Sequence, residues 1–415
     1  AGSSAESGTY TPGTYTGVSH NGMGGDVTVE VELSSDSIAS VKVVEHSEPP
    51  NISDSAISQI PQDIGQYQSL KLDAVSGATV TSNAILEAVC DAITKSGASC
   101  EDLKNKEVVK DTQSKTVELT TDLVVVGAGA AGMSAAVSAA DEGVESIIVF
   151  EKQSNIGGNA IVSGGFVPNP NLPDELKADN NPGYEAFIQD VLEQGPQTEE
   201  EELYWDQLTE EVAQWEADGK KSLFDSPLWM SIEGTRADGG SIADYLSYVD
   251  NLNSFNSWME GFGVTWSKAH GIVGYTWPRW TSIDGFFSGQ GFFHYFNEAI
   301  EKNGYPIDIY TNTPVTKLNV NDKGEVIGVT ACSTDGTIYE VTARKGVLLA
   351  TGGYAANKQM LVEYNTMWDG LTEDIITTNT KGATGDGIKM AQEIGAATDM
   401  MDVQMMFPMA DIKTG

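Results

Sequence analysis

The stretch LVVVGAGAAGMSAAVSAADEGVESIIVFEK, residues 123–152, determines which fold to expect. A short apolar run leads into the pattern G-x-G-x-x-G at Gly127, Gly129 and Gly132, an alanine-rich segment follows, and a second apolar run ends at Glu151. This order predicts a strand, a glycine turn, a helix and a second strand parallel to the first. We therefore expect an α/β protein with a Rossmann-like, parallel sheet.

The glycines and the acidic residue after them suit a dinucleotide. The first glycine permits the tight turn, the second lets a pyrophosphate approach the backbone, and the third lets the helix pack on the strand. The N-terminus of the helix favours the phosphate charge. Glu151 can accept hydrogen bonds from ribose hydroxyl groups. The pattern alone does not separate NAD from FAD.

The residues after Glu151 resemble the FAD-binding domain of the fumarate reductase and succinate dehydrogenase flavoprotein family. KQSNIGGNAIVSGG (152–165), LLATGG (348–353) and GATGDGIKMAQEIGA (382–396) match its signatures in order. The resemblance implies non-covalent FAD, and Asp386 either contacts it or only caps the helix expected to begin at Gly387. The cofactor-binding residues implied are Gly127, Ala128, Gly129, Ala130, Ala131, Gly132, Glu151, Lys152, Gly157, Gly158, Asn159, Ser163, Gly164, Gly165, Val315, Ala350, Thr351, Gly352 and Asp386.

The first part of the chain has a different pattern. DVTVEVEL (26–33) alternates polar and apolar residues, IASVKVVEH (38–46) follows a turn-rich stretch, and a helical pattern starts near Ser82. We expect a small α+β domain over residues 1–105, a polar linker over 106–119 and the FAD-binding domain over 120–415. Within the last, a helical, aromatic-rich insert is expected at about 166–305.

The stretch DAVSGATVTS, residues 73–82, resembles the attachment motif of FMN-binding domains. TYTGVSHNGMGGDVTVEVEL (14–33) and HSEPP (46–50) resemble the same domain. In such domains a flavin transferase joins FMN to a threonine through a phosphoester, which a helix N-terminus would stabilise. The pattern D-x-x-S-G-A-T makes Thr79 the bearer and Thr81 the second choice, while Thr81 or Ser82 alternatively caps the helix.

An FMN-binding domain fused to this FAD-binding domain is the layout of extracytoplasmic fumarate- and urocanate-type reductases. In that family electrons pass from FMN to FAD and then, as a hydride, to an activated double bond, and an arginine delivers the proton. That arginine and the clamp domain are expected beyond Gly415, in a C-terminal segment or a second chain. The resemblance implies an oxidoreductase with an unsaturated small-molecule acceptor, a flavin transferase for maturation, and an electron donor at a membrane or surface.

One stretch departs from the family. In QMMFPMA (404–410), Phe407 stands where the family has a histidine that binds a substrate carboxylate. Phenylalanine cannot pair with a carboxylate, so we expect an arylacrylate-like acid rather than fumarate. A dehydrogenase or reductase of steroid-like enones and an electron-carrier flavoprotein remain alternatives.

The aromatic segment 266–293 contains a second candidate substrate residue, Arg279. This arginine either orients an anionic group or stacks on Trp280. His270 and His294 are expected to be structural, and most of the aromatic side chains are expected to form core.

Composition limits the partners and the location. The chain has 60 acidic and 23 basic residues and a formal net charge of −37, so neither nucleic acid nor anionic lipid is expected as a partner. The start AGSSAESG, without a methionine, leads us to expect a processed bacterial chain that is secreted, periplasmic or at the cell surface. No Cys/His pattern suggests a metal, and Cys90 and Cys100 form either a disulfide or two buried thiols.

Overall fold

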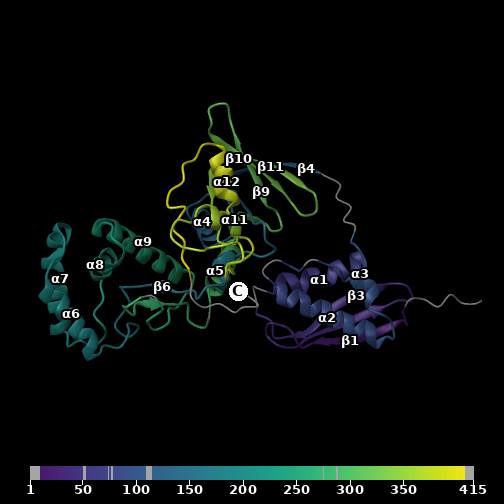
Figure 1. Cartoon of the computed structure of the whole chain (residues 1–415), viewed down its shortest axis with the longest axis horizontal. Helices are drawn as coiled ribbons and strands as arrows, with labels where there is room; N and C mark the ends of the chain where they lie inside the picture. Colours follow the sequence, from purple (N-terminus) through teal and green to yellow (C-terminus); the bar gives the residue numbers. More distant parts are fainter. Residues whose placement is uncertain are drawn as a thin grey trace, which may run out of the picture. The chain divides into compact units, whose positions relative to one another are not determined.

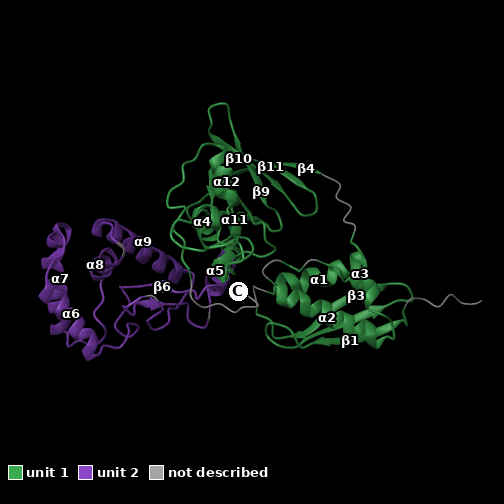
Figure 2. Cartoon of the chain, viewed as in Figure 1, with its two compact units in different colours: residues 1–161, 300–415 green, residues 162–299 purple. Residues whose placement is uncertain are grey.

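The computed structural model describes residues 10–49, 53–72, 74–75, 78–108, 115–273, 275–286 and 288–406. The chain divides into two compact units, residues 1–161 with 300–415 and residues 162–299 (Figure 2). The first unit contains the N-terminal domain and the parallel sheet. No helix within the described residues is long and apolar enough to span a bilayer.

The N-terminal domain is a three-stranded antiparallel sheet with helices packed on one face (Figure 1). In the central strand Val27, Val29 and Val31 are fully buried and alternate with polar residues, as the sequence predicts. The elements are β1 Gly13–Ser19, β2 Val27–Leu33, β3 Ile38–His46, α1 Asp54–Tyr67, α2 Thr79–Lys95 and α3 Glu101–Asn105. The expected α+β domain is therefore present.

Helix α2 lies close to β1 because of a glycine. A Cβ atom on Gly17 would lie 1.9 Å from the carbonyl oxygen of Ala88, so only glycine permits this approach. In the same part of α2, Cys90 forms a disulfide with Cys100, the residue before α3. The structure thus selects the disulfide over the two thiols.

Two boundaries and one whole helix differ from the sequence expectations. Helix α2 begins at Thr79 rather than near Ser82. Helix α1 was not expected; it contains Pro61, which usually ends a helix. Strand β4 begins at Thr116, within the stretch expected as a linker, because TVELT already alternates as a strand does.

The first unit also contains a six-stranded sheet in the order β8-β5-β4-β11-β10-β9. Strands β8, β5, β4 and β11 are parallel, whereas β10 pairs antiparallel with β11 and β9. The elements are β4 Thr116–Val126, α4 Ala130–Asp141, β5 Ile147–Phe150, α5 Gly158–Val162, β8 Ile307–Tyr310, β9 Val315–Val320, β10 Val326–Cys332, β11 Ile338–Leu349, α11 Lys358–Glu363 and α12 Asp386–Glu393. The α/β fold expected from the glycine turn is confirmed.

The second unit is helical in its first part and irregular in its second. Its elements are β6 Val167–Pro168, α6 Pro182–Gln194, α7 Glu199–Ala217, α8 Pro227–Asp238, α9 Ile242–Gly261, β7 Trp280–Thr281 and most of α10 Gln290–Asn303, whose last residues belong to the first unit. Between α9 and α10 the chain forms short bridges, such as Trp266 with Ile283, so the expectation of a helical insert fails there. Aromatic side chains form much of its core, and Trp229 and Trp277 pack edge to face with ring centroids 5.4 Å apart.

We predict that Gly17→Ala destabilises the N-terminal domain by about 1–3 kcal/mol, the usual cost of overpacking a well-packed core. Hydrogen exchange of amides in β2 and α2 of the whole chain measures this change. Gly65→Ala in α1 is the matched control, because its Cβ would meet nothing within 4 Å. Equal exchange in the two variants would contradict the packing described for β1 and α2.

Candidate functional site

A cavity of about 420 Å³ lies in the first unit, where three neighbouring strands end. Strand β4 ends before Gly127, β5 before Glu151 and β11 before Ala350, and all three of these residues line the cavity. The carboxyl ends of parallel strands are the usual place for a ligand in such sheets. The predicted residues that line the cavity are Gly127, Gly129, Ala130, Ala131, Glu151, Lys152, Gly157, Gly158, Asn159, Val315, Ala350, Thr351, Gly352 and Asp386.

The glycine turn has the geometry that its sequence implies. Gly127 has a φ of +100°, and a Cβ there would lie 2.5 Å from the carbonyl oxygen of Ala350. A Cβ on Gly132 would lie 1.9 Å from the Gly127 carbonyl oxygen, whereas one on Gly129 would meet nothing within 4 Å. Gly132 therefore permits helix–strand packing, and Gly129 leaves the backbone open to the cavity.

The N-terminus of α4 faces the same cavity. Its N-cap is Gly129, which has no side chain to satisfy the first N–H groups, and Ala130 and Ala131 line the cavity. Free N–H groups and the helix dipole favour an anion there. The residues present thus fit a pyrophosphate.

Glu151 is held in place by two backbone N–H groups. Its Oε2 accepts from Ala128 at 2.9 Å and its Oε1 from Gln153 at 2.8 Å. Burial raises the pKa of Glu151, although these hydrogen bonds oppose the shift. Each oxygen keeps a second lone pair for a hydroxyl donor. Ala128 does not line the cavity, and its observed role is to position this carboxylate.

Lys152 joins the end of β5 to the start of α12. Its Nζ donates to Asp386 Oδ2 at 2.6 Å and to Thr384 Oγ1 at 2.5 Å. Partial burial works against the charge of Asp386, but the hydrogen bonds from Lys152 and Thr384 outweigh it and lower the pKa. The N-cap of α12 is Gly385, and Asp386 is the first residue of the helix. No side chain makes a capping hydrogen bond at this end. The expectation that Asp386 caps the helix is therefore wrong, because Lys152 binds its carboxylate.

A second polar link joins the same two parts of the chain. The Asn159 side-chain amide donates to Asn379 Oδ1 at 2.7 Å and its oxygen accepts from the Thr380 N–H at 2.7 Å. Sequence reasoning missed Gln153, Thr380 and several other lining residues, among them Pro314, Gly382, Ala383 and Met390. Thr380 and Gly382 lie at or just before the GATGDG signature, which was the available signal.

Three expected cofactor residues belong to the second unit. Ser163 accepts the Gly289 N–H through its carbonyl oxygen at 3.1 Å, and a Cβ on Gly165 would lie 2.6 Å from the backbone of Ser288. Gly164 lies between them. Their role toward FAD stays a prediction.

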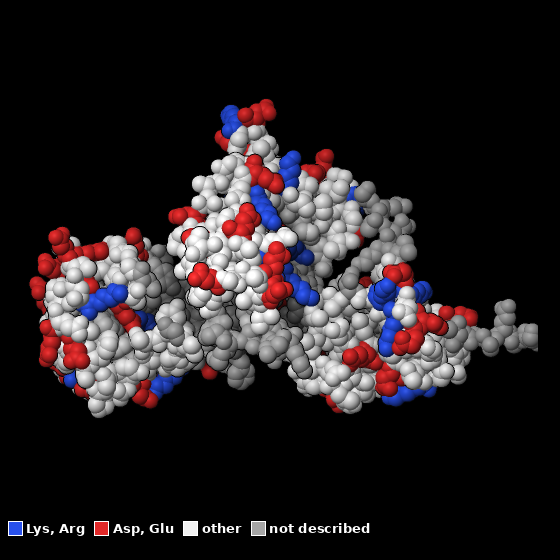
Figure 3. Space-filling model, in the orientation of Figure 1, with Lys and Arg blue, Asp and Glu red and all other residues white. Residues whose placement is uncertain are grey.

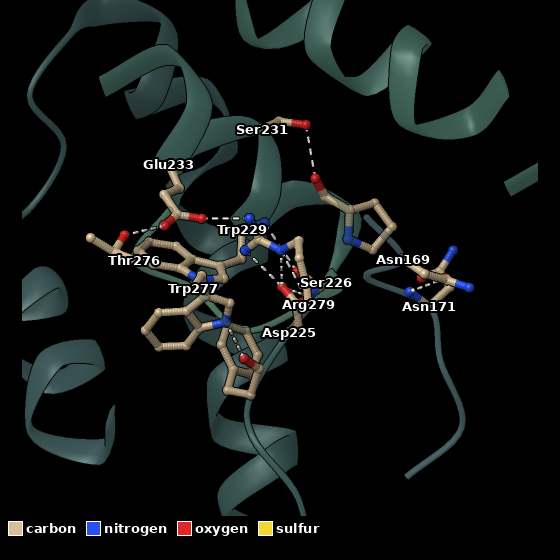
Figure 4. Close-up of polar contacts among 12 residues, drawn as sticks. Asn169, Asn171, Asp225, Ser226, Trp229, Ser231, Glu233, Thr276, Trp277 and Arg279 are labelled. Atoms are coloured by element: carbon tan, nitrogen blue, oxygen red, sulfur yellow. Dashed lines mark hydrogen bonds and ion pairs between the residues drawn. The ribbon is translucent and has the colours of Figure 1, made fainter. Parts of the chain in front are cut away.

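Arg279 has a different environment from either sequence interpretation (Figure 4). It is 7% exposed, and its guanidinium donates to Asp225 at 2.9–3.2 Å and to Glu233 at 2.5 Å. Burial raises the pKa of Asp225 to about 6, against the pull of Arg279. Trp280 instead packs on Tyr275, with ring centroids 4.4 Å apart. Two carboxylates, those of Asp225 and Glu233, already compensate the charge of Arg279. We therefore conclude that this arginine belongs to a buried ion-pair network.

The two histidines of the second unit have structural contacts. The Phe166 ring packs edge-on against His270, with centroids 5.0 Å apart, and His294 lies 3.6 Å from Glu298 on the same helix. Neither contact suggests a chemical role. No group of three residues able to hold a metal is found among the residues that the structure describes.

The attachment motif lies at the start of α2, although Asp73, Ser76 and Gly77 lie outside the described residues. Thr79 is half-buried, whereas Thr81 is 1% exposed and donates its hydroxyl to Glu48.

Two hydroxyls were alternatively expected to cap this helix. The Ser82 hydroxyl, fully buried, donates to the Ala78 carbonyl at 2.8 Å and accepts the Val75 N–H at 3.0 Å. Since the N-cap is Ala78 and no side chain caps the helix, neither Thr81 nor Ser82 is the expected cap. Phe407 lies outside the described residues.

Comparisons with known proteins match both flavin-binding domains of the chain. Residues 122–414 match the FAD binding domain family and residues 22–94 the FMN-binding domain family. The NADH:acrylate oxidoreductase of Vibrio harveyi is 35% identical over 431 residues, which cover 98% of this chain and 42% of that protein. The urocanate reductase of Eggerthella lenta is 29% identical over 398 residues, which cover 95% of this chain and 58% of that protein.

A solved structure is also similar. The open conformation of a flavocytochrome c3 fumarate reductase is 27% identical, covers 69% of this chain and 42% of its own, and has a TM-score of 0.44. The chain spans about half the length of the two curated relatives.

We predict that Glu151→Ala weakens FAD binding by about 1.5–3 kcal/mol, the contribution of hydrogen bonds to a charged group. Fluorescence titration of the flavin-free protein measures the dissociation constant. Glu145→Ala, an exposed change two residues before β5, is the control and should leave affinity unchanged. If acid releases NAD and no FAD from the purified protein, the assignment of the cavity is wrong.

Proposed function

This chain belongs to the FAD binding domain family, and from that premise we propose that it reduces the C=C bond of an α,β-unsaturated acid. The observation that carries the proposal is the cavity at the ends of β4, β5 and β11, with its glycine turn and Glu151, in one chain with an FMN-binding domain. The names of the two curated relatives, an acrylate oxidoreductase and a urocanate reductase, support this class of substrate.

Several residues that line the cavity would have a specific task. When bound, FAD supplies hydride transfer and FMN relays electrons to it, so that two electrons and two protons add across the double bond. The turn at Gly127 and Gly129 and the N-terminus of α4 would hold the pyrophosphate, and Glu151 the ribose hydroxyls. Lys152 and Asn159 would hold residues 380–386 against the cavity through their links to Asp386 and Thr380.

We propose further that FMN is joined to Thr79. The half-burial of Thr79 supports this choice, because Thr81 is buried and already bonded to Glu48. In the attachment, the Thr79 oxygen bonds to the flavin phosphorus, the pyrophosphate bond of FAD breaks, AMP leaves, and the hydroxyl proton passes to solvent. A flavin transferase would catalyse this step. The disulfide between Cys90 and Cys100 supports maturation in an oxidising compartment outside the cytoplasm, where an electron donor at a membrane or surface would serve the enzyme.

The acceptor is proposed to be a monocarboxylate with an apolar or aromatic tail. A carboxylate in a desolvated site needs compensating charge or hydrogen bonds, because an unpaired ion there costs several kcal/mol. Phe407 supplies no such compensation, but an aromatic ring can contribute about 0.5–1.5 kcal/mol against another ring. Acrylate, which the Vibrio harveyi relative is named for, is itself a monocarboxylate.

We predict an FMN-sized adduct on the protein when it is produced with a flavin transferase, and loss of the adduct in Thr79→Ala. Intact-mass spectrometry measures both. Thr81→Ser, which keeps the buried hydroxyl, is the control and should retain the adduct. An adduct that persists in Thr79→Ala would move the site, and its absence from the unmodified chain under every co-expression would refute covalent attachment.

We predict that a cinnamate-like acid exceeds fumarate by at least about tenfold in kcat/KM, which requires about 1.4 kcal/mol of transition-state preference. Anaerobic assays of the full-length protein with a reduced viologen compare the two acceptors. Phe407→His should shift the ratio toward fumarate, because an imidazolium can pair with the second carboxylate. Faster turnover of fumarate by the unmodified enzyme would show that the inference from Phe407 is wrong.

A further inference from the structure

Three separate stretches of the N-terminal domain meet at one buried carboxylate, that of Glu48. Glu48 is 4% exposed, and its Oε1 accepts the Gly24 N–H at 2.8 Å. Its Oε2 accepts the hydroxyl of Thr81, in the first turn of α2. The Glu48 N–H in turn donates to Nδ1 of His46, at the end of β3. One side chain thus links the loop before β2, the chain after β3 and the start of α2.

The loop before β2 is fitted closely to the chain after β3. A Cβ on Gly24 would lie 1.8 Å from the carbonyl oxygen of Ser47, and one on Gly22 would lie 2.5 Å from Glu48 Oε1. Glycine at both positions therefore lets the backbone reach the carboxylate. Burying an ionised carboxylate is unfavourable unless hydrogen bonds compensate it, so a simple packing role would be better served by an apolar side chain.

The hydrogen bond to Thr81 fixes how α2 is turned about its own axis. Successive helical residues are about 100° apart, so Thr79 and Thr81 point to roughly opposite sides. Thr81 is turned inward onto Glu48, Val80 is 44% exposed and Thr79 is half-buried. As no side chain caps this helix, its first turn would otherwise fray.

We propose that Glu48 is a positioning residue for flavin attachment: by holding Thr81 inward, it presents the Thr79 hydroxyl to the flavin transferase and keeps the first N–H groups of α2 ordered for the phosphoester. This inference rests on the proposed attachment of FMN to Thr79. Glu48 acts through Thr81 and not on the reacting hydroxyl, so its hydrogen bonds matter and its charge does not.

The test measures the rate of FMN attachment to the whole chain with purified flavin transferase and FAD, by intact mass at timed intervals. Glu48→Ala and Thr81→Val, which break the link from its two sides, should each slow attachment at least tenfold. Glu48→Gln should stay within about twofold of the unmodified chain, because the amide oxygen can accept the Gly24 N–H while its NH₂ group donates to the Thr81 hydroxyl. Thr81→Ser, which keeps the hydroxyl, should do the same.

A loss of general stability is distinguished by Gly17→Ala, which weakens the same domain at a different contact. At a temperature where both variants are folded, Gly17→Ala should receive FMN at the normal rate. Hydrogen exchange of the first turn of α2 should rise more in Glu48→Ala than in Gly17→Ala, because only Glu48→Ala removes the contact with that turn. Normal labelling of Glu48→Ala, or equally slow labelling of Gly17→Ala, would overturn the positioning role. Slow labelling of Glu48→Gln would do so too, since it would make the charge essential. No adduct on the unmodified chain would overturn the proposed attachment itself, and this inference with it.

Discussion

The close approach of two glycines sets the geometry of the candidate cofactor site. Because Gly132 has no side chain, α4 can lie against the carbonyl of Gly127, and its N-terminus then stands directly over the end of β4. The same turn needs a positive φ at Gly127 and no side chain facing Ala350, the residue after β11. The strand ends, the helix dipole and the carboxylate of Glu151 converge only because these backbone contacts are available.

Charged side chains occur in two settings, on the surface and in ion pairs. The visible face carries many acidic side chains and fewer basic ones (Figure 3), as the net charge of −37 requires. In the interior of the second unit, by contrast, Arg279 is matched closely with Asp225, and at the cavity Lys152 pairs with a partly exposed Asp386. Removing one partner of the buried pair formed by Arg279 would leave an uncompensated charge, which is the costly change for such pairs.

Much of the fold and part of the site follow from local sequence patterns. The alternation in β2, the strand–turn–helix pattern around Gly127 and the acid at Glu151 each depend on residues a few positions apart, and each appears in the structure as predicted. The contacts of Arg279 and the link from Lys152 to Asp386 could not be predicted, because they join side chains from distant parts of the chain. In the attachment motif, family pattern alone ranked Thr79 above Thr81, and the burial of Thr81 on Glu48 could not be predicted from that local pattern.

The order of the strands has a consequence for biosynthesis. Strand β5 pairs with β8, yet the whole second unit, residues 162–299, lies between them in the chain, and the cavity also needs Asp386. Closing so long a loop is entropically costly and makes such contacts slow to form. The N-terminal domain, whose last helix ends at Asn105, is synthesised first and depends on much shorter connections. The two flavin-binding domains of one polypeptide are thus expected to fold at different rates, the FMN-binding domain before the FAD-binding domain.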